Sequence, residues 1–398
     1  MKRILFISTH NFATNPRLLK EVELALNNQF EVNVICFEFN NWSRDINKGI
    51  QARLLERGAV VHLISAGRKP FMPWVSSILK ENFYLYLLPF LKNKIEVIAR
   101  AFFRRHSLIV NALNNVKKAD LVVGHNPGTM VACLHAAKLF NCKAGFDMED
   151  YHPGEGHDKT QQHYIRKLIM HVLPKLNYVS FASDQIKNKV EEDLGQVYNH
   201  WFSLPNYSPS SQFIMPEQNL PEEKIKLVWF SQNINVHRGL EQILPLLNNY
   251  SSFIELHLIG NLNEFFFNEH LQKFTFIKVH KSLPQIALYQ KLSEFDIGLA
   301  LEPVKDLNND LALSNKILAY FQAGLFILAT NTTAQATFLK EFPLHGLYFS
   351  KEHNSFMEVF SKLIENIASI RKQKAERYKH AQNESWEKHA YKLLEVWK

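Results

Sequence analysis

The sequence predicts an α/β protein built from two Rossmann-like domains whose parallel sheets face each other across a cleft. Three observations support this prediction. The length of 398 residues favours two or three domains. Short β-branched and aromatic runs alternate with segments of helical period through both halves of the chain, as in βαβ units. A segment rich in Pro and Ser, residues 205–222, separates the two halves.

The expected strands are short apolar runs followed by polar or glycine-containing turns. In the first half we expect strands at residues 4–8, 32–37, 60–64, 121–124, 144–147 and 179–182. In the second half we expect them at residues 227–231, 255–260, 275–279, 297–301 and 326–330. The carboxyl ends of such strands form the edge where open α/β sheets bind their ligands. The residues that follow each strand are therefore the first candidates for a site.

The composition restricts the class of partner. The formal net charge of +8 and the pI near 9.1 leave an excess of Lys and Arg. This excess suits phosphorylated small molecules, an acidic membrane surface or nucleic acid, or it is a solvated basic surface. No nucleic-acid-binding module is recognisable, so we expect no nucleic acid partner. The three cysteines form no close pair, which argues against a disulfide framework and favours a reducing, cytoplasmic compartment.

Membrane insertion is not expected from the hydropathy pattern. The apolar run after Met1-Lys2-Arg3 is too short for a secretory signal and fits a first buried strand. The longest dense apolar stretch, residues 83–91, is interrupted by Pro89 and falls short of the ~20 residues that span a bilayer. Residues 73–118 nevertheless combine aromatic and basic side chains. They are either helices packed on the first domain or a peripheral contact with anionic lipid at the inner face of the cell membrane.

Glycine fingerprints for phosphate are missing. Neither G-x-G-x-x-G nor G-x-x-x-x-G-K-[ST] occurs, which disfavours a dinucleotide dehydrogenase and a P-loop enzyme. Phosphate therefore has to be bound by other groups.

Two basic residues at expected helix starts in the second half are the candidates. Ser314 or Asn315 can cap a helix that has Lys316 in its first turn. A cation there opposes the helix dipole unless an anion lies beside it, and a diphosphate would supply that anion. Arg238 follows a strand expected to end at Ser231 and can bind phosphate in a bidentate manner. For each cation the alternative is an ordinary solvated surface residue.

Strand ends in the first half carry ionisable side chains. His125 directly follows an apolar strand, so it is either an acid–base group or a structural loop histidine. Asp147, Glu149 and Asp150 end the next strand, either as a site that binds hydroxyl groups or as an acidic helix start.

The amino-terminal helix start is a further candidate. Asn15 can cap a helix that begins with Pro16, and Arg17 follows as a candidate ligand for an anion or as a plain first-turn residue.

A metal site is not expected. The histidines His152, His157 and His163 do not follow a zinc-binding spacing, and no Asp-x-Asp pair is present to chelate a nucleotide-bound ion.

The motifs resemble those of GT-B glycosyltransferases of the family-4 kind, which are retaining enzymes that use nucleotide-activated sugars. The stretch SNKILAYFQAG, residues 314–324, is similar to the donor-site pattern of that family. The stretch WFSQNINVHRGLE, residues 229–241, is similar to the first βα loop of its donor domain. By this resemblance Arg238 and Lys316 hold the donor phosphates. The other residues implied for the donor are Ser231, Gln232, Asn233, Glu302, Ser314, Asn315 and Tyr320.

The resemblance also covers the first half. The loop that begins at His125 and the acidic strand end at 147–150 are similar to family segments near the transferred sugar. They imply catalytic roles for His125, Asp147 and Glu149. The residues implied for the acceptor are Asn15, Arg17, Asn126 and Asp150.

One departure from the family pattern concerns a carboxylate. The family has a glutamate just before the tyrosine of the donor helix and another one earlier, whereas this chain has Ala319 and Leu311 at those positions. Glu302 is the nearest acidic substitute, at a different spacing.

The resemblance implies an organisation and a function. Residues 1–206 would bind the acceptor, residues 207–375 would bind the nucleotide sugar, and residues 376–398 would form a helix that returns to the first domain. The implied activity is a metal-independent, hexosyltransferase-like transfer from a UDP- or GDP-linked sugar to a glycan or lipid-linked acceptor, in cell-surface polysaccharide synthesis, with no cofactor. The alternatives are a catalytically silent subunit that binds glycan or a partner, which Ala319 favours, and a sugar-nucleotide epimerase.

Overall fold

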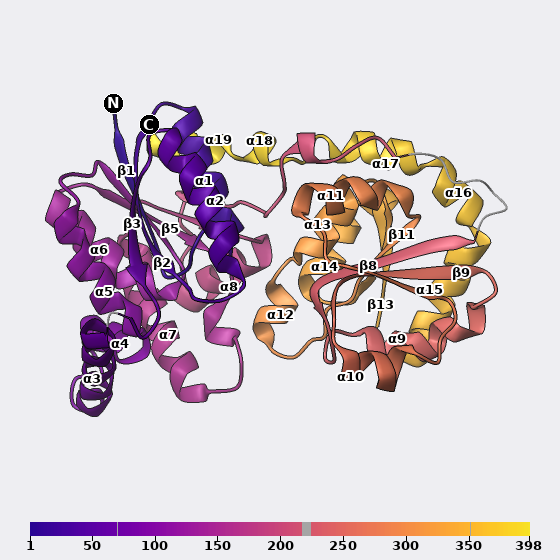
Figure 1. The fold of residues 1–398 in the computed structure, drawn as a ribbon, viewed down its shortest axis with the longest axis horizontal. Coiled ribbons are helices and arrows are strands. Elements are labelled where there is room, and N and C mark those ends of the chain that lie inside the picture. The colour runs from indigo at the N-terminus through magenta and orange to yellow at the C-terminus, as the bar shows by residue number, and fades with distance from the viewer. Residues whose placement is uncertain (70, 217–223, 351) are drawn as a thin grey trace. The chain divides into compact units, whose positions relative to one another are not determined.

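The computed structural model describes residues 1–69, 71–216, 224–350 and 352–398 (Figure 1). The chain divides into two compact units. The first comprises Met1–Leu204 together with Lys392–Lys398, and the second comprises Pro205–Tyr391. Residues 217–222 of the Pro- and Ser-rich boundary segment lie outside the described residues.

The sheet of the first unit has seven parallel strands in the order β3-β2-β1-β4-β5-β6-β7. Its first strand pairs with β2 on one side and with β4 on the other, so β1 and β4 flank the topological switch point beside which such sheets bind ligands. The strands are β1 Arg3–Ser8, β2 Glu31–Glu38, β3 Val60–Ser65, β4 Leu121–His125, β5 Lys143–Met148, β6 Tyr178–Phe181 and β7 Trp201–Ser203.

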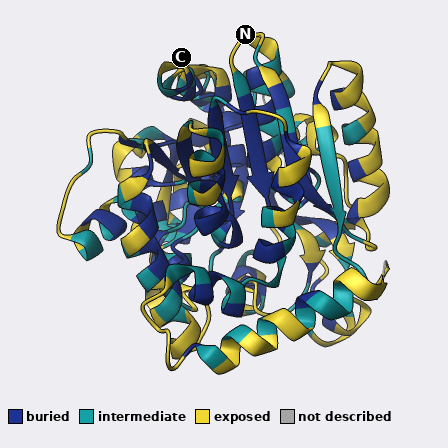
Figure 2. Cartoon of the chain, turned by 90° about the vertical axis from the view of Figure 1, so that its left-hand side faces the viewer, coloured by how far each residue is buried: buried dark blue, intermediate teal, exposed yellow. Residues whose placement is uncertain are grey.

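Helices cover both faces of this sheet, and Figure 2 shows the buried residues concentrated on the strands, with exposed residues along the outer helices. The helices are α1 Pro16–Asn27, α2 Ser43–Glu56, α3 Phe71–Leu87, α4 Ile95–Phe102, α5 Arg104–Ala112, α6 Met130–Phe140, α7 Lys159–Val172 and α8 Asp184–Leu194. Short 3-10 turns follow at Leu113–Asn115, Pro127–Thr129, His152–Gly154 and Leu173–Lys175.

Helix α1 begins where the sequence predicts. The side chain of Asn15 accepts a hydrogen bond from the Leu18 N–H at 2.9 Å, and Pro16 occupies the first position. The buried face of α1 carries Leu18 and Val22, as an amphipathic helix requires. Arg17 and Glu21 are buried on the same helix, so α1 brings two charges to the interior.

The last residues of the chain complete the first unit. Trp397 of α19 (Tyr391–Trp397) is buried, and its ring meets those of Phe6 and Phe30 edge-on at centroid distances of 5.8 and 6.0 Å. The indole Nε1–H donates a hydrogen bond to the Tyr178 hydroxyl at 2.8 Å. The first unit is therefore built from two separate stretches of chain.

The second unit has a six-stranded parallel sheet in the order β10-β9-β8-β11-β12-β13. Its strands are β8 Ile225–Ile234, β9 Ile254–Leu262, β10 Ile277–His280, β11 Ile297–Ala300, β12 Phe326–Thr330 and β13 Gly346–Phe349. Its helices are α9 Leu240–Leu247, α10 Glu264–Phe266, α11 Gln285–Lys291, α12 Leu307–Leu311, α13 Asn315–Gln322, α14 Thr333–Glu341, α15 His353–Glu365, α16 Ile367–Lys372, α17 Lys374–Ala381 and α18 Trp386–His389.

Both faces of this second sheet are buried. Leu227 and Trp229 of β8 belong to one apolar cluster, whereas Val228 between them belongs to another, together with Ile317 of α13. This alternation is typical of a parallel strand covered by helices on each side. The predicted α/β fold class with two parallel sheets is therefore confirmed.

Two strands and the shape of the carboxyl-terminal helix differ from the expectation. The strands β7 and β13 were not predicted, because three or four residues at a sheet edge are too short to show a period. The expected terminal helix is interrupted between α17 and α18, where Ser385 is extended. Ser and Asn compete for backbone hydrogen bonds and favour such breaks.

Among the helices formed by the described residues, none combines the length and the apolar character needed to cross a membrane.

A close approach between β11 and α13 yields a prediction for stability. A Cβ atom at Gly298 would lie 2.3 Å from Cγ of Tyr320, whose ring is fully buried. We expect Gly298→Ala to destabilise the second unit by about 1–3 kcal/mol in urea unfolding, because neither the strand nor the ring can move freely.

Gly49 in α2 is the matched control, since a Cβ there meets nothing within 4 Å. We expect Gly49→Ala to stabilise the chain by about 0.5–1 kcal/mol. Equal effects of the two substitutions would contradict the packing of Tyr320 on β11.

Candidate functional site

The candidate site of the first unit lies at the carboxyl ends of neighbouring strands. The register places Ser8 of β1 opposite His125 of β4, and His125 opposite Asp147 of β5. Asp147 in turn lies opposite Ser180 of β6. Two of the predicted residues, His125 and Asp147, are therefore direct neighbours in a polar row beside the switch point of the sheet.

His125 is fully buried and is the last residue of β4, whereas the sequence predicts the strand to end at residue 124. Its Nε2 lies 3.4 Å from a carboxylate oxygen of Glu21. Its Nδ1 lies 3.5 Å from Asp147 and 3.7 Å from Glu149. These are ion-pair contacts without hydrogen-bond geometry, so the imidazole is surrounded by carboxylates but bonded to none of them.

These neighbours determine the charge of the imidazole. Burial alone disfavours the imidazolium, but the Glu21 carboxylate and those of Asp147 and Glu149 outweigh it and raise the pKa of His125 well above its ordinary value. The ring is therefore a buried cation near neutral pH, and Glu21 is its closest counter-charge.

Arg17 and Asp147 form a buried, two-pronged ion pair. Arg17 Nε donates to Asp147 Oδ2 at 2.6 Å and Nη2 donates to Oδ1 at 2.5 Å. Nη1 donates to the Leu204 carbonyl at 2.7 Å, and the Ser180 hydroxyl donates to Asp147 at 2.7 Å. Both predicted residues are thus engaged with protein partners. Burial opposes the ionised carboxyl, but Arg17 lowers the pKa of Asp147 far below its usual range.

Glu21, His125 and Asp147 also form the one group within the described residues whose ligand atoms lie close enough together to hold a metal ion. Arg17 argues against a metal there, because a guanidinium already takes both oxygens of Asp147 and would repel a second cation. The three histidines that do not follow a zinc-binding spacing lie outside this group: His152 contacts Glu155 at 3.1 Å, and His157 and His163 are exposed.

Asn126 has a backbone conformation that side chains rarely adopt. Its φ of 73° and ψ of 149° fall in a region essentially limited to glycine, and strain of this kind is concentrated at functional sites. The Asn126 side-chain oxygen accepts hydrogen bonds from the hydroxyls of Ser8 at 3.0 Å and Thr9 at 3.3 Å. The predicted residue Asn126 is thus held rigidly between β1 and β4.

The remaining predicted residues of the first unit differ in exposure. Asn15 is buried and serves as the cap of α1. Glu149 is the only member of the His125 cluster with appreciable exposure, at 23% of its side chain. Asp150 is partly exposed beside it. A ligand that reaches this cluster would therefore meet Glu149 and Asp150 before His125.

In the second unit, Lys316 forms an ion pair with Glu302. Lys316 Nζ lies 2.7 Å from Glu302 Oε1, and both side chains keep some exposure, at 14% and 17%. The backbone N–H of Glu302 donates to the Thr330 hydroxyl at 2.9 Å, which ties the loop after β11 to the end of β12. The anion that a first-turn lysine requires is thus supplied by Glu302.

The start of α13 is capped as predicted, whereas Tyr320 lies in the core. Ser314 accepts a hydrogen bond from the Ile317 N–H at 3.4 Å, and Asn315 accepts one from Asn206 at 2.8 Å. Tyr320 packs on Gly298 and against the Phe230 ring at a centroid distance of 5.3 Å. Its ring is buried between α13 and the sheet and is not part of the surface.

Arg238 lies at the neighbouring strand end. β8 and β11 are adjacent in the sheet, and a Cβ at Gly239 would approach that of Leu301 to 3.0 Å. Arg238 is exposed. Among the described residues, no carboxylate oxygen lies within 4.0 Å of its guanidinium nitrogens, the limit for an ion pair. The two predicted cations, Arg238 and Lys316, therefore follow adjacent strands of one sheet.

The strand before Arg238 is longer than predicted. The sequence predicts a strand end at Ser231, but β8 continues to Ile234 across an irregularity in its pairing with β9. The reason is that residues Asn233 and Ile234 still pair with β9 after the irregularity, although they are polar or isolated in the sequence. Ser231, Gln232 and Asn233 are thus strand residues, and the loop begins at Asn235.

Sequence reasoning missed Glu21 and Ser180. Glu21 follows Arg17 by one helical turn on the buried face of α1, and a charged pair among Leu18, Val22 and Ala25 was the available signal. Ser180 carried no signal, since a serine in an apolar strand is common.

Ala319 offers no carboxylate and lies in the core. It is 3% exposed and belongs to the apolar cluster around α13. Glu302 is therefore the carboxylate that the structure provides beside Lys316.

Comparison with solved structures finds the same fold over the whole chain. A glycosyltransferase from Rickettsia africae matches with a TM-score of 0.67 at 14% identity, covering 100% of this chain and 98% of that chain. The Anabaena HepE protein in complex with UDP matches with a TM-score of 0.68 at 12% identity, over 100% and 99%. Sucrose-phosphate synthase from Thermosynechococcus elongatus matches with a TM-score of 0.67 at 12% identity, over 100% and 98%.

The chain therefore has the GT-B fold of these glycosyltransferase structures, and the predicted resemblance is confirmed at the level of the fold. No family model matches the sequence, and no curated protein matches it either.

The buried pair of Arg17 and Asp147 yields a prediction for stability. Arg17→Met leaves a buried carboxylate without its counter-charge, so we expect a loss of about 3–5 kcal/mol in the unfolding free energy of the first unit. Arg17→Met combined with Asp147→Leu should recover most of that loss. The matched control is Arg53→Met, which breaks an exposed pair with Glu23 and should cost at most about 1 kcal/mol. If Arg17→Met and the double variant with Asp147→Leu were equally stable, the pairing of Arg17 with Asp147 would be contradicted.

The charge of His125 yields a prediction for pH dependence. Because the folded-state pKa is raised, the imidazolium contributes stability that is fully present below the ordinary value of 6.5 and is lost as the pH rises through the folded-state pKa. We expect the melting temperature of the native chain to fall relative to that of His125→Gln when the pH is raised from near neutral into the alkaline range. Parallel curves for the two proteins would show that His125 is uncharged.

Proposed function

We propose that the chain is a glycosyltransferase that moves a sugar from a nucleotide diphosphate donor to a glycan or lipid-linked acceptor, in cell-surface polysaccharide synthesis. The observation that supports it best is the GT-B fold over the whole chain, shared with glycosyltransferases and with a protein solved with UDP. Each unit also carries a charged cluster at the carboxyl ends of its strands, where α/β sheets bind ligands.

The proposed donor site is the start of α13 with Lys316, Glu302 and Arg238. The two cations follow adjacent strands and can share the charge of one diphosphate with the free N–H groups of the helix start. Glu302 takes the place of the glutamate missing at position 319 and accepts hydrogen bonds from hydroxyls of the nucleoside. The proposed donor is a UDP- or GDP-linked sugar.

In the proposed reaction, the bond between the anomeric carbon and the oxygen of the leaving phosphate breaks, and a bond to an acceptor hydroxyl oxygen forms. The hydroxyl proton passes to the leaving diphosphate. Arg238 and Lys316 stabilise the charge that develops on the diphosphate, so no metal ion is required in this proposal. Retention at the anomeric carbon follows from the family-4 resemblance.

The proposed acceptor site is the His125 cluster of the first unit. Glu149 is the exposed carboxylate of this cluster and is assigned to a sugar hydroxyl, together with Asp150 and the rigidly held Asn126. His125, as a buried cation, lies 3.7 Å from Glu149 and supplies a counter-charge beside it. Arg17 and Asp147 position the cluster, since both are engaged with one another.

The proposed location is the cytoplasm, with peripheral contact at the inner face of the cell membrane through residues 73–118. Support comes from α3, where Leu79, Phe83 and Tyr86 are exposed at 63%, 57% and 73%. Apolar side chains on the water-facing side of a helix are typical of a surface that docks elsewhere.

A catalytically silent GT-B subunit is the second candidate function. The buried Ala319 favours it, because the carboxylate found in the family at that position is missing. Detection of sugar transfer or donor hydrolysis would exclude this candidate.

The donor site yields a prediction for binding. We expect Lys316→Ala and Arg238→Ala each to weaken the affinity for the matching nucleoside diphosphate roughly 10- to 100-fold, because each removes a charge-assisted hydrogen bond. Glu302→Gln should weaken binding of the nucleoside while keeping the geometry. A thermal-shift panel of UDP, GDP, CMP and dTDP identifies the nucleotide first.

Lys340→Ala is the matched control, since Lys340 is a basic residue of α14 that lies over Tyr348. It should leave nucleotide affinity unchanged. If both Lys316→Ala and Arg238→Ala bind every tested nucleotide like the native chain, and turnover of sugar nucleotides is unaltered, the donor site lies elsewhere.

A further inference from the structure

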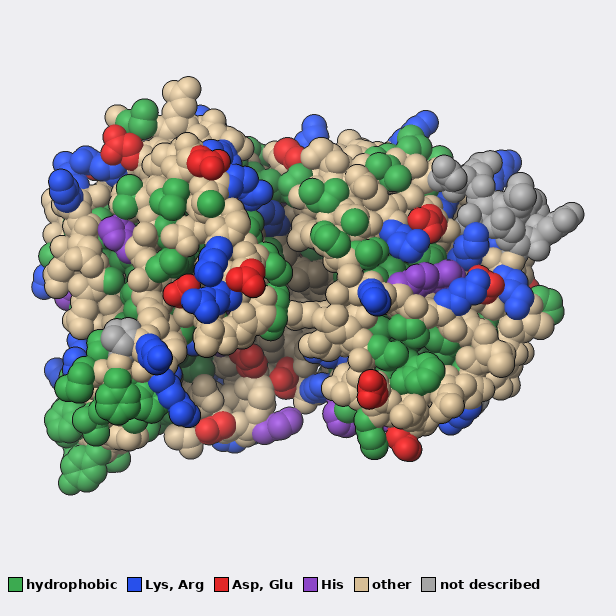
Figure 3. Space-filling view, in the orientation of Figure 1, with side chains coloured by type: hydrophobic (Ala, Val, Ile, Leu, Met, Phe, Trp, Pro, Cys, Tyr) green, Lys and Arg blue, Asp and Glu red, His purple; other side chains and the backbone are tan. Residues whose placement is uncertain are grey.

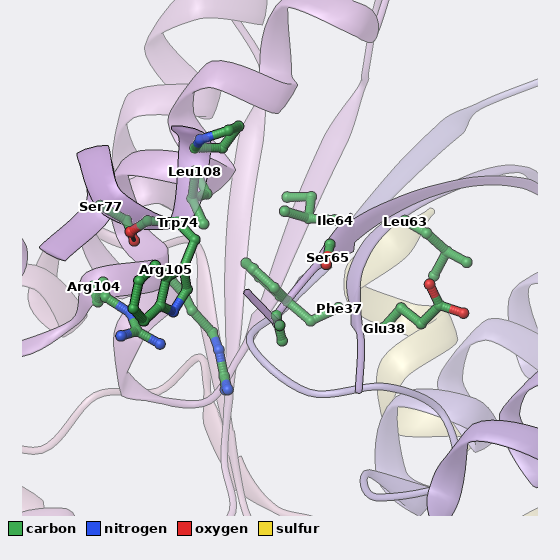
Figure 4. Close-up of a pocket in the computed structure, with 13 residues that line it drawn as sticks. Phe37, Glu38, Leu63, Ile64, Ser65, Trp74, Ser77, Arg104, Arg105 and Leu108 are labelled. Atoms are coloured by element: carbon green, nitrogen blue, oxygen red, sulfur yellow. Dashed lines mark hydrogen bonds between the residues drawn. The ribbon is translucent and has the colours of Figure 1, made fainter. Parts of the chain in front are cut away.

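A cavity of about 400 Å³ lies in the first unit, beside the His125 cluster but separate from it. Figure 4 shows its two walls: residues at the ends of β2 and β3 form one, and residues of α3 and α5 form the other. Phe37, Ile64 and Trp74 make most of the lining apolar. The polar groups that reach it include the guanidinium groups of Arg104 and Arg105 (Figure 4).

The two arginines of this cavity lack acidic partners. Among the described residues, no carboxylate oxygen lies close enough to a nitrogen of Arg104 or Arg105 to form an ion pair, for which the limit is 4.0 Å. Burial lowers the pKa of Arg105, and the charge of Arg104 lowers it further. Two neighbouring cations in a partly buried space are stabilised when an anion joins them.

The nearest acidic residues do not fill that role. Glu38 lines the cavity but lies 3.8 Å from Arg44, and in Figure 4 its carboxylate points away from the two arginines. Burial raises the pKa of Glu81, and Arg104 opposes that rise from beyond ion-pair distance.

Arg105 is held in place by neutral partners. Its guanidinium lies over the rings of Phe37 and Phe39, at 5.3 and 4.7 Å from their centroids. Its Nη1 donates to the Thr9 carbonyl at 2.9 Å. Cation–π contacts and one backbone hydrogen bond leave the remaining N–H groups of the planar guanidinium available to two oxygens of a phosphate.

The same bond connects the cavity to the proposed acceptor site. Thr9, whose carbonyl binds Arg105, donates its hydroxyl to Asn126. Burial lowers the pKa of His10. Glu149 raises this pKa and Arg105 lowers it, so His10 interacts with the charges of both the acceptor site and the cavity. Two hydrogen bonds through Thr9 thus link Arg105 to Asn126, one of the residues assigned to the acceptor sugar.

An apolar stripe on α3 begins beside the cavity. Met72, Leu79, Phe83 and Tyr86 are exposed and recur at a spacing that places them on one face of the helix. Figure 3 shows hydrophobic side chains gathered over the part of the first unit where α3 lies in Figure 1, next to basic side chains. The exposed basic residues around the stripe are Arg68, Lys69, Lys80, Lys92 and Lys94.

We infer that this cavity binds the phosphate or diphosphate group of a lipid-linked acceptor, with Arg104 and Arg105 as its ligands. The hydrocarbon chain lies along the apolar stripe of α3 and enters the bilayer, while the basic residues around the stripe face anionic headgroups. The sugar end of the acceptor reaches Asn126 and Glu149. This inference rests on the proposed function and names its acceptor class: an amphiphile with a phosphate between sugar and lipid.

The experiment measures binding of the full chain to vesicles by flotation. The probe is a polyprenyl monophosphate in phosphatidylcholine vesicles, compared with phosphatidylglycerol in phosphatidylcholine at equal surface charge, and with free pyrophosphate as a competitor. We expect the native chain to prefer the polyprenyl phosphate vesicles, and Arg104→Gln with Arg105→Gln to weaken this binding roughly 10- to 100-fold. Phe83→Ser with Tyr86→Ser should weaken binding to both kinds of vesicle.

Two further variants separate loss of the site from loss of fold. Lys117→Gln with Lys118→Gln removes the same charge from exposed residues that do not line the cavity, and should change binding less than about twofold. Arg104→Lys with Arg105→Lys keeps the charge and should retain part of the binding. All variants should keep the nucleotide-induced thermal shift of the native chain, because the donor residues are in the other unit.

The outcomes are distinct. Equal binding of the native chain to both anionic vesicles, or unchanged binding of Arg104→Gln with Arg105→Gln, would overturn the inference. The inference would also be overturned if free pyrophosphate competed with an affinity equal to that of the polyprenyl phosphate, since the phosphate group alone would then be the ligand. Failure of the proposed function would appear differently, as absence of any nucleotide-induced shift or sugar turnover in the native chain while selective vesicle binding persists.

Discussion

The buried ion pair between Arg17 and Asp147 is the interaction on which the first unit's polar cluster depends. It joins the first turn of α1 to the end of β5 and, through the Leu204 carbonyl, to the point where the chain leaves the unit. Arg17 offsets part of the charge of Asp147, and Glu21 and Glu149 supply the other carboxylates beside His125. These carboxylates stabilise the buried imidazolium, since a buried charge without a partner is strongly destabilising.

The ion pair of the second unit is more exposed to solvent than that of the first. Lys316 and Glu302 form their pair at a strand end that is still partly open to solvent, and Arg238 nearby is exposed. An incoming anion can compete with Glu302 for Lys316, whereas no ligand can compete for Arg17 without opening the core. The first unit therefore holds a fixed cluster, and the second holds charges that can be redistributed when a ligand binds.

The strands and the helix starts were predictable because local chemistry determines them. Alternating apolar runs marked eleven strands, and Asn15 and Ser314 are caps in the structure as they were in the sequence. The short edge strands β7 and β13 were not, because their pairing depends on neighbours distant in the chain.

The candidate residues were predictable in identity but not in environment. His125 and Asp147 lie at strand ends, which the sequence shows, but their charged partners Glu21 and Arg17 come from a helix more than a hundred positions earlier. The anion predicted beside Lys316 was a diphosphate, and Glu302 was predicted as a substitute carboxylate; the contact between Lys316 and Glu302 appears only in the folded unit. The cavity at Arg104 and Arg105 arises from four elements and had no local signature.

The return of the chain to its first unit has a consequence for biosynthesis. Trp397 fills the space between Phe6, Phe30 and Tyr178, so the hydrophobic interior of that unit is incomplete when residue 204 leaves the ribosome. The second unit, by contrast, is formed from one uninterrupted stretch. Because the second unit extends to Tyr391 and the first needs Trp397, both interiors become complete only when nearly the whole chain has been synthesised. An amino-terminal half without its last helix would leave the apolar surface around Phe6 and Phe30 exposed, and such surface promotes aggregation.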